Sequence, residues 1–562
     1  ELREEKPSGF KAMALRARER MATAITRDLE GEPEICGVLT AMVLGMRDQA
    51  TPEMEEPFRY SGTLHIFAVS GLHVGIFALI AWLLLKPLGL SRAHVTLLLI
   101  PLLFFYAFVT GWRPSAVRAA TMAAVFLASY CLHRDPQLLN SLGMAAVLIL
   151  AGNTNQLFLP GFELSFAVLL AIIAFTKPIQ RPFRHWLYPD AFIPTTLGDI
   201  VAVSGAAWFG SLPLMAFTFH LVTPVAVLAN CLLMPLGFFI LLTAAMSMLC
   251  SLVTFLGPLN ILFNNANFAL VHGLIALAEG FSSVPGGNFL IATRLPFTRP
   301  PIEITVLDMP RGGACTHLQM RGGGNELIDV GHLSSFRLLT EPYLRHAGLN
   351  TVDRLWLSHG DTAHVGAGPD FLELYQTKAY HPSWPSRSPS IQRIDTMLDQ
   401  RKMPATLVQA GQSLPLARGA YWEILYPPEN ETFAPAPADD RGLVMRLQGH
   451  NWRVLFMADA GFHTERWLLD SAQDLRAEVL IKGHHAEDVS GLAEFLDTVG
   501  PQVIVMDSET DRPSTVPPWA GRHGCQILDQ KDVGAVILGI SKSKISVRGF
   551  RSRQDIFLKR ER

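Results

Sequence analysis

The sequence lacks any close pairing of cysteines. Its six cysteines are spread over 562 residues, and three of them lie inside apolar runs. Neither a disulfide framework nor a Cys-x-x-Cys zinc site is therefore expected. The six are Cys36, Cys131, Cys231, Cys250, Cys315 and Cys525.

Charged residues are scarce as well. They make up 17% of the chain against 49% hydrophobic residues, and the shortage is concentrated in the middle of the sequence. Such a distribution is typical of a membrane protein with more than one domain. The net charge of −2 argues against a globally basic nucleic-acid binder but leaves local patches open.

A cleavable signal pattern is also missing ahead of the apolar runs. The sequence begins at Glu1, so we expect it to be a piece of a longer protein. Residues 1–60 are predicted to form an amphipathic or juxtamembrane helical region. Within it, residues 9–31 have helical spacing, which suits a helix lying on the membrane or a soluble helix equally. The apolar stretch 34–46 is too short to span a bilayer.

Residues 61–290 are predicted to form a polytopic α-helical membrane domain. Pro213, Pro224 and Pro235, with Gly205, Gly210 and Gly237, predict kinked or broken helices, which favour a pathway over a simple anchor. We count eight apolar segments, at about 64–85, 94–112, 115–133, 139–152, 162–176, 197–218, 221–250 and 255–281.

The charges of the connecting loops predict an orientation. The loop from Lys177 to Pro194 carries three bases against one acid, which places it in the cytoplasm. Alternation then places the residues before 60 and after 290 outside the cytoplasm. Arg294 and Arg299 flank the last segment on that outer side and weaken the assignment.

The residue pattern changes after the proline-rich segment RLPFTRPPIE. Short β-type runs such as EITVLDM, DRLWLSHG and PQVIVMDS alternate with helical stretches, which predicts a soluble α/β domain over residues 301–548. Residues 549–562 are expected to form a basic tail. That tail is either a solvated end or a contact for phosphates or lipid.

Two long motifs carry a resemblance. The stretch FRYSGTLHIFAVSGLHVGIFALIAWLLL (58–85), followed by WRPSAVRAATMAAVFLASY, resembles the ComEC family of DNA-uptake channel proteins. The downstream domain is similar to the metallo-β-lactamase domain, of αββα architecture, that most members carry at their C-terminus. The family's additional N-terminal segments and small β-barrel domain have no counterpart here.

Polar residues in the first motif are unusual for a helix that faces lipid. Such groups at membrane depth face a cavity or a partner, so they either line the DNA path or pack helices together. Gly71 and Gly75 have the spacing that lets another backbone approach. Arg113 and Arg118 would meet phosphates at an outer mouth, or extend to the interface. The candidates for the channel are His65, Ser70, Gly71, His73, Arg113 and Arg118.

The stretch LWLSHGDTAHVGAG (355–368) places His359, Asp361 and His364 on a tight turn after an apolar run. These side chain types converge on a metal ion in many proteins, so the stretch is a metal site, a remnant of one or a polar loop. The resemblance implies a two-metal site built from these residues, from Asp459 in LFMADAG as the bridging carboxylate, and from His484 or His485 in IKGHHAED. It makes Asp361 and Asp459 the catalytic carboxylates.

Three positions depart from the pattern that the resemblance implies. Ala363 stands where the family has a metal-binding Asp, Gly313 replaces an acid after Asp308, and Gly442 replaces a Ser. We therefore expect a first divalent ion and a weaker second one. Oxygen ligands favour Mn²⁺, whereas histidines suit Zn²⁺.

The resemblance implies a protein of the inner membrane that passes single-stranded DNA into the cytoplasm during natural transformation. Double-stranded DNA, the lipid bilayer and other competence proteins would be its partners. The C-terminal domain would lie outside the cytoplasm and degrade the strand that is not imported. One alternative is a membrane-anchored metallohydrolase for other phosphoesters, and another is a channel whose C-terminal domain has lost catalysis.

Overall fold

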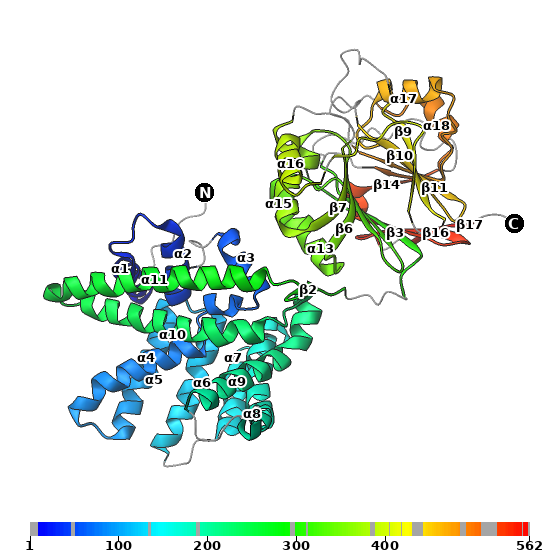
Figure 1. Cartoon of the computed structure of the whole chain (residues 1–562). Coiled ribbons are helices and arrows are strands. Elements are labelled where there is room, and N and C mark those ends of the chain that lie inside the picture. The colour runs from blue at the N-terminus through cyan, green and yellow to red at the C-terminus, as the bar shows by residue number, and fades with distance from the viewer. Residues whose placement is uncertain are drawn as a thin grey trace. The chain divides into compact units, whose positions relative to one another are not determined.

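The computed structural model describes most of the chain in two compact units, Glu1–Phe289 and Leu290–Arg562 (Figure 1). The described residues are 9–46, 51–132, 137–186, 192–292, 298–310, 313–382, 388–403, 405–416, 419–429, 442–483, 490–506, 525–552 and 555–559.

The first unit is helical. Its α-helices are α1 (Gly9–Thr26), α2 (Pro33–Leu44), α3 (Pro52–Tyr60), α4 (Gly71–Leu85), α5 (Arg92–Val109), α6 (Pro114–Cys131), α7 (Leu138–Gly152), α8 (Pro160–Trp186), α9 (Phe192–Leu214), α10 (Ala226–Ser251) and α11 (Gly257–Ser282). Short turns of other helix types are η2 (Leu64–Phe67), η3 (Lys86–Leu88), η4 (Thr154–Phe158), η5 (Met215–Phe219) and η6 (Thr254–Leu256). The short strand β1 (Leu221–Val222) also belongs to this unit, and the short strand β2 (Phe289–Leu290) includes its last residue.

Helices form at all eight of the predicted apolar segments, but fewer qualify as spans. Among the described residues, five stretches are long and apolar enough to cross a membrane: Gly71–Leu88, Pro160–Pro182, Gly198–Phe219, Ala226–Ser251 and Thr254–Ser282. The apolar parts of α5 and α7 are shorter, and α6 is diluted by Ser, Thr and Arg118. The 12-residue α2, too short to span as predicted, is almost wholly buried in the unit's core.

The predicted break in the helices lies between α9 and α10. Pro213 is followed by the wide turn η5, and His220 then adopts a positive φ of 55° before β1. The carbonyl of Thr223 accepts from the indole of Trp208 at 2.9 Å and from the N–H of Ala226 at 3.1 Å, so protein groups satisfy the backbone at this break. Pro235, in contrast, lies inside the continuous α10.

Close approach of two helices occurs at Gly210 rather than at Gly71 and Gly75. A Cβ at Gly210 would lie 2.4 Å from the Cβ of Ala171, so α8 and α9 touch through this glycine. A Cβ at Gly71 or Gly75 would meet nothing within 4 Å. The expectation of a close contact there was wrong within this chain, because the glycine face of α4 is exposed.

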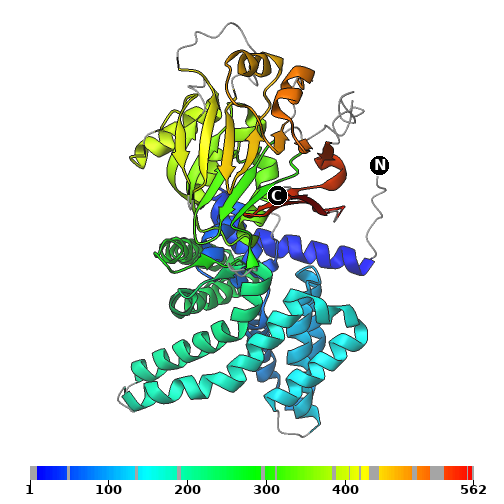
Figure 2. The ribbon, with the colours of Figure 1, turned by 90° about the vertical axis from the view of Figure 1, so that its right-hand side faces the viewer.

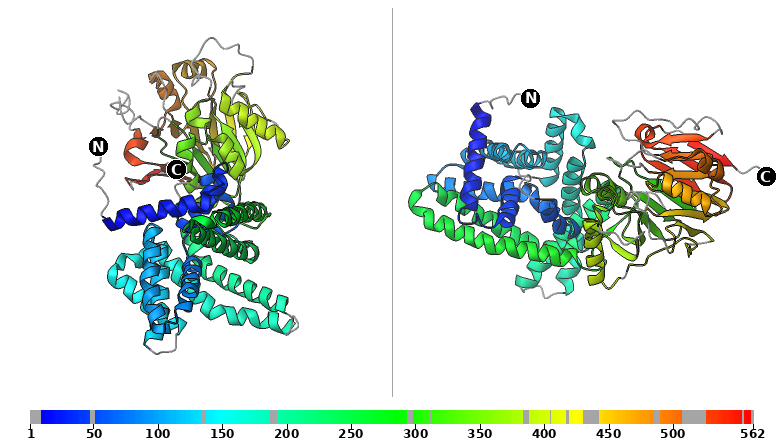
Figure 3. Two further views of the ribbon diagram at one scale, coloured as in Figure 1. Left: turned by 90° about the vertical axis from the view of Figure 1, so that its left-hand side faces the viewer. Right: turned by 90° about the horizontal axis from the view of Figure 1, so that it is seen from above.

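A buried stripe of asparagines on α11 holds three helices together. Asn260 and Asn264 both donate to the carbonyl of Ala24 near the end of α1, at 3.0 and 2.9 Å, and Asn264 also donates to the carbonyl of Arg27 at 2.9 Å. Ser247 of α10 donates to Asn264 at 2.6 Å. These bonds satisfy carbonyls that a helix end leaves open. They dock α1 against the long pair α10 and α11, which it crosses in Figures 2 and 3.

The second unit has two sheets between outer helices. The eight-stranded sheet has the order β17-β16-β15-β3-β4-β5-β6-β7, and the seven-stranded sheet has the order β14-β13-β12-β11-β10-β9-β8. The strands are β3 (Ile302–Val306), β4 (Thr316–Met320), β5 (Asn325–Ile328), β6 (Thr351–Leu357), β7 (Gln376–Pro382), β8 (Ser413–Pro415), β9 (Tyr421–Tyr426), β10 (Val444–Gly449), β11 (Trp452–Phe456), β12 (Val479–Lys482), β13 (Val503–Met506), β14 (Gln526–Asp529), β15 (Val536–Ile540), β16 (Lys544–Gly549) and β17 (Asp555–Lys559).

Helices cover both outer sides, which confirms the predicted αββα arrangement (Figure 1). The helical elements are α12 (Leu333–Ser335), η8 (Phe336–Thr340), α13 (Glu341–His346), α14 (Thr362–Val365), α15 (Gly368–Leu374), α16 (Pro389–Gln400), α17 (Phe462–Asp470), α18 (Ala493–Val499) and α19 (Gln530–Val533). Apolar side chains from both sheets form one core between them. The predicted tail, residues 549–562, includes β17, which pairs with β16 in full register, so the sheet extends beyond residue 548.

Candidate metal centre

Three buried side chains converge at the ends of two strands, one from each sheet. His359 and His364 follow β6, and Asp459 follows β11; the potential ligand atoms of the three lie within 4.8 Å of one another. The two imidazole rings are 4.1 Å apart between centroids. Nε2 of His364 is 2.9 Å from Oδ2 of Asp459, and Nε2 of His359 is 3.9 Å from the same atom.

Asp329 orients both histidines from behind. It follows β5, the parallel neighbour of β6, so both strands end at the same edge of the sheet. Its carboxylate accepts from Nδ1 of His364 at 2.8 Å and from Oγ of Ser358 at 2.6 Å. Because the Ser358 hydroxyl donates its proton to Asp329, it accepts from Nδ1 of His359 at 3.0 Å. Each ring is thus held by Nδ1 and directs Nε2 toward Asp459.

This donor set fits a divalent metal ion. Two imidazoles held by their second nitrogens and one carboxylate form a common ligand set for zinc, and such outer hydrogen bonds set the tautomer of a ligating histidine. Burial opposes the charged form of His364, but the carboxylates of Asp459 and Asp329 outweigh it and hold its pKa well above the usual value. A bound ion would replace the proton that His364 shares with Asp459.

The backbone around Asp459 leaves its carboxylate little room to move. Ala458 has a positive φ of 46°, and its carbonyl accepts from the N–H of Gly483 at 2.7 Å. A Cβ at Gly483 would lie 1.9 Å from Oδ1 of Asp459. Only a glycine at this position leaves room for the carboxylate as it stands.

The other predicted ligands are placed differently. Asp361 is exposed and stands at the N-cap of α14, outside the convergent group. His484 and His485 lie outside the described residues. Asp329 was not predicted from the sequence, although an acid directly after a strand, on the same edge as the His359 turn, is a usable signal.

Two of the three departures from the family pattern, Gly313 and Ala363, are neighbours in the fold. A Cβ at Gly313 would lie 2.8 Å from the backbone oxygen of Ala363. The acid that the resemblance expects after Asp308 therefore has no room in this turn. Gly442, the third departure, precedes Leu443, whose N–H donates to the carbonyl of Ser358 at 2.7 Å.

The predicted channel residues are held largely by helix packing. Nδ1 of His73 accepts from the N–H of Ser70 at 3.0 Å, and its Nε2 donates to the carbonyl of Met42 at 2.9 Å. Arg118 is buried and donates to Ser165 of α8 at 3.1 Å. Arg113 precedes α6 and lies against Gly45, while His65 and Gly71 are exposed. These contacts favour the packing alternative for His73 and Ser70. The burial of Arg118 fits neither extension to the interface nor an open outer mouth within this chain. A DNA path stays a prediction.

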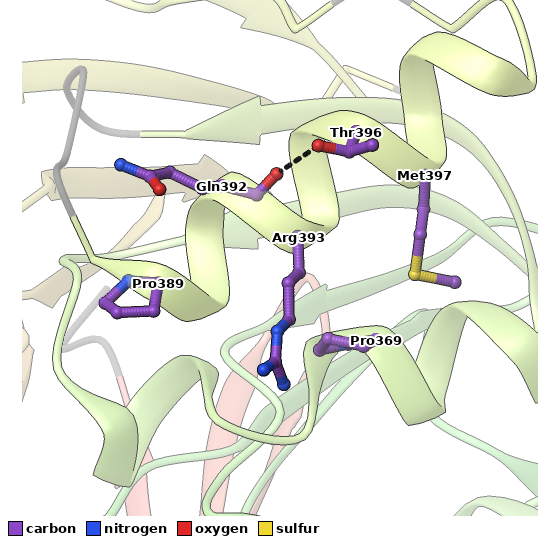
Figure 4. A pocket seen from close by; sticks show the side chains of 6 residues that line it. All are labelled: Pro369, Pro389, Gln392, Arg393, Thr396 and Met397. Carbon is purple, nitrogen blue, oxygen red and sulfur yellow. Dashed lines mark hydrogen bonds between the residues drawn. The ribbon is translucent and has the colours of Figure 1, made fainter.

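The second unit also has an open groove between α15 and α16 (Figure 4). Its one charged lining residue is Arg393, which points toward Pro369 in Figure 4. None of the metal cluster residues lines it. The lining residues are Pro369, Pro389, Gln392, Arg393, Thr396 and Met397.

Comparison with known proteins agrees with the two units. Residues 42–305 match the competence protein family, and residues 309–390 match the metallo-beta-lactamase superfamily. The chain is 24% identical to ComE operon protein 3 of Bacillus subtilis (strain 168) over 560 residues, which covers 89% of this chain and 70% of that protein. It is 23% identical to competence protein ComA of Neisseria gonorrhoeae over 554 residues, covering 92% and 76%.

A solved structure, the metallo-beta-lactamase fold protein YhfI from Bacillus subtilis, covers 41% of this chain and 96% of its own at 15% identity. The TM-score of that match is 0.27. The resemblance to the ComEC family drawn from the two membrane motifs is confirmed by the family matches and by the named relatives. The chain carries a competence protein domain followed by a metallo-β-lactamase superfamily domain.

Proposed function

We propose that this chain is the inner-membrane component that passes single-stranded DNA into the cytoplasm during natural transformation. The observation that carries the proposal is that residues 42–305, which match the competence protein family, contain all five stretches found, among the described residues, to be long and apolar enough to span a membrane. The broken backbone between α9 and α10 supports a pathway, since non-helical backbone at membrane depth needs protein or a water-filled cavity around it.

We further propose that the C-terminal domain hydrolyses the DNA strand that is not imported and lies outside the cytoplasm. A divalent ion, Mn²⁺ or Zn²⁺, would supply Lewis acidity toward a phosphoryl oxygen. His359, His364 and Asp459 would hold it. Asp329 fixes the histidines, and Gly483 leaves space for the Asp459 carboxylate.

A second candidate is a channel whose C-terminal domain has lost catalysis. It is favoured by Ala363, Gly313 and Gly442, which stand where the resemblance implies polar or acidic residues, and by the single cluster of three potential ligands among the described residues. In this case the domain guides DNA or assembles partners.

Transport is tested in a naturally competent host that lacks the gene for this chain. Uptake of labelled DNA into the cytoplasm and the number of transformants should both be lost, while DNA binding at the cell surface persists. A deletion strain that transforms as well as its parent would refute the transport role.

Hydrolysis is tested on the full chain in lipid nanodiscs with Mn²⁺ or Zn²⁺. We expect labelled DNA to be degraded by the wild-type protein and by the control His346→Ala, but not by His359→Ala, which removes a ligand. Intact DNA in all three reactions, with transformation lost on deletion, would favour the second candidate.

A further inference from the structure

The last two strands, β16 and β17, present one exposed face, and β17 lies in the tail for which the sequence left a phosphate or lipid contact open. Alternate residues of these strands point into the core between the sheets: Ile545, Val547, Ile556 and Leu558. The intervening residues are directed outward, and most of them are exposed. We define the β16–β17 face by these outward residues: Lys544, Ser546, Arg548, Asp555, Phe557 and Lys559.

The β16–β17 face is positively charged. Lys544 and Lys559 stand directly opposite each other in the strand register, and Lys542 precedes them in the turn after β15. Among the ion pairs of the described residues, none involves these three lysines. Arg548, by contrast, is paired with Asp555. Like charges opposite each other destabilise a strand pair unless an anion lies between them.

An aromatic ring lies among the charged side chains of this face. Phe557 is 50% exposed, and the ammonium of Lys544 is 4.9 Å from the centre of its ring. Phe550, in the turn between the two strands, is 70% exposed. Exposed rings beside cations on a flat strand surface are the combination with which proteins bind single-stranded nucleic acids, the ring stacking on a base and the cations meeting phosphates.

We infer that the β16–β17 face binds single-stranded DNA, with a base stacked on Phe557 and phosphates at Lys544 and Lys559. A duplex fits less well, because its bases are stacked on one another and present no open face to the ring. The choice of DNA over RNA rests on the proposed function. The face would then hold the strand as an electrostatic and stacking platform, separate in its residues from the metal cluster.

A membrane contact is the rival occupant, and the polar residues of the face argue against it. Ser546 is the register partner of Phe557, and the Arg548–Asp555 ion pair adjoins it. Burial of that ion pair against lipid would cost its hydration. A DNA strand, with its own polar groups and water, leaves the pair solvated.

The test is photo-crosslinking of the full chain in nanodiscs of neutral phosphatidylcholine to a 20-nucleotide single strand that carries 5-iododeoxyuridine. Mass spectrometry locates the adducts. We expect an adduct at Phe557 or Phe550, suppressed by unlabelled single strand and much less by duplex. Lys544→Gln with Lys559→Gln should lower its yield about tenfold and reduce the salt slope of binding by about 1.4, for two phosphates.

The matched control is Lys378→Gln with Lys402→Gln, which removes the same charge from two other exposed lysines of this unit. Phe557→Leu keeps apolar bulk but removes the stacking surface, and it should weaken binding through this face about tenfold. Equal adduct yields in the two double variants would overturn the inference, as would adducts confined to other residues. Labelling of Phe557 by a photoreactive phosphatidylglycerol, with no DNA adduct, would make the face a membrane contact and overturn it too.

This readout is independent of transport. A deletion strain that still transforms refutes the proposed function, yet a specific adduct at Phe557 would leave the binding face standing. Conversely, lost transformation with no adduct there would leave the transport role intact and remove this inference.

Discussion

Gly313 and Ala363 lie against each other beside the metal cluster, but they differ in whether the structure has room for an acidic side chain. A side chain at 313 would enter the space of the Ala363 carbonyl, at 2.8 Å from a Cβ. Ala363 itself is half-buried at the start of the one-turn helix α14, where its methyl group is not enclosed. The first position is therefore closed to an acid by the backbone, whereas the second is open to one.

We predict that Gly313→Asp and Ala363→Asp differ in stability. The first should lower the free energy of unfolding of the C-terminal unit by about 1–3 kcal/mol, because the turn must move to admit a side chain. The second should change it by less than about 0.5 kcal/mol, since an acid at a helix N-terminus is electrostatically favourable. Denaturant unfolding of the full chain, followed by tryptophan fluorescence, measures both. Equal losses of unfolding free energy in the two variants would contradict the lack of room for a side chain at position 313.

Sequence analysis identified His359, His364 and Asp459 by pattern, but it missed Asp329. The reason is physical: the resemblance points to ligands, whereas Asp329 acts on the far side of the rings, through Nδ1 of His364 and the hydroxyl of Ser358. Only the adjacency of β5 and β6 reveals this role. Asp361 was predicted from its place in the motif, and a motif does not show that the residue is exposed at the N-cap of α14.

At the scale of the elements, the asparagine stripe of α11 fixes the position of α1. The carbonyls of Ala24 and Arg27 have their hydrogen bonds from Asn260 and Asn264 rather than from water. A sequence reading treats asparagines in an apolar run as polar interruptions. Their spacing of four along a helix, facing the end of another helix, becomes meaningful only once α1 and α11 are seen in contact.

We predict that Asn264→Leu releases the end of α1. The carbonyl of Arg27 loses the donor from Asn264, the buried carbonyl of Ala24 loses one of its donors, and the Ser247 hydroxyl loses its acceptor. This costs about 1–3 kcal/mol, so amide hydrogens in the last turn of α1 should exchange faster by about tenfold or more. Hydrogen exchange of the full chain in nanodiscs measures this. Asn265→Leu is the matched control, because Asn265 is exposed and bonds Asp28. Unchanged exchange in Asn264→Leu, or equal acceleration in both variants, would contradict the role of Asn264 in holding the end of α1.

At the scale of the whole C-terminal unit, one buried acid bonds both sheets. Glu326 of β5 accepts from the indoles of Trp356 and Trp422 at 2.8 and 2.6 Å, and it pairs with Arg354 at 3.1 Å. Trp422 belongs to the opposite sheet. Burial raises the pKa of Glu326, and the attraction of Arg354 and the two indoles only partly opposes this.

This shift predicts a loss of stability as pH rises. The folded state binds the proton of Glu326 more tightly than the unfolded chain, so its stabilising effect is full below the ordinary carboxyl pKa and declines from there up to the raised folded value. Glu326→Gln removes the titration, so its free energy of unfolding should fall less than that of wild type from about pH 4.5 upward. Unfolding of the full chain at several pH values tests this, and parallel profiles would contradict it.

How much of the whole molecule could be predicted depends on which forces act locally. Hydropathy and strand alternation predicted a helical membrane unit and an αββα unit, because burial dictates both patterns. Five helices rather than eight meet the length and composition of a span among the described residues, since a helix can be apolar for packing inside a protein as well as for lipid. The basic composition of residues 549–562 obscured the alternation of apolar and polar residues in β17, in which every second residue is buried.

That final strand has a consequence for how the protein is produced. A chain ended near residue 548, where the charge pattern places the domain boundary, would lose Ile556 and Leu558 from the core and leave the backbone of β16 without its neighbour. An open, partly apolar strand edge is a template for pairing with further copies. Such a truncated product should aggregate when it is expressed, whereas one that keeps residue 559 should stay soluble in detergent.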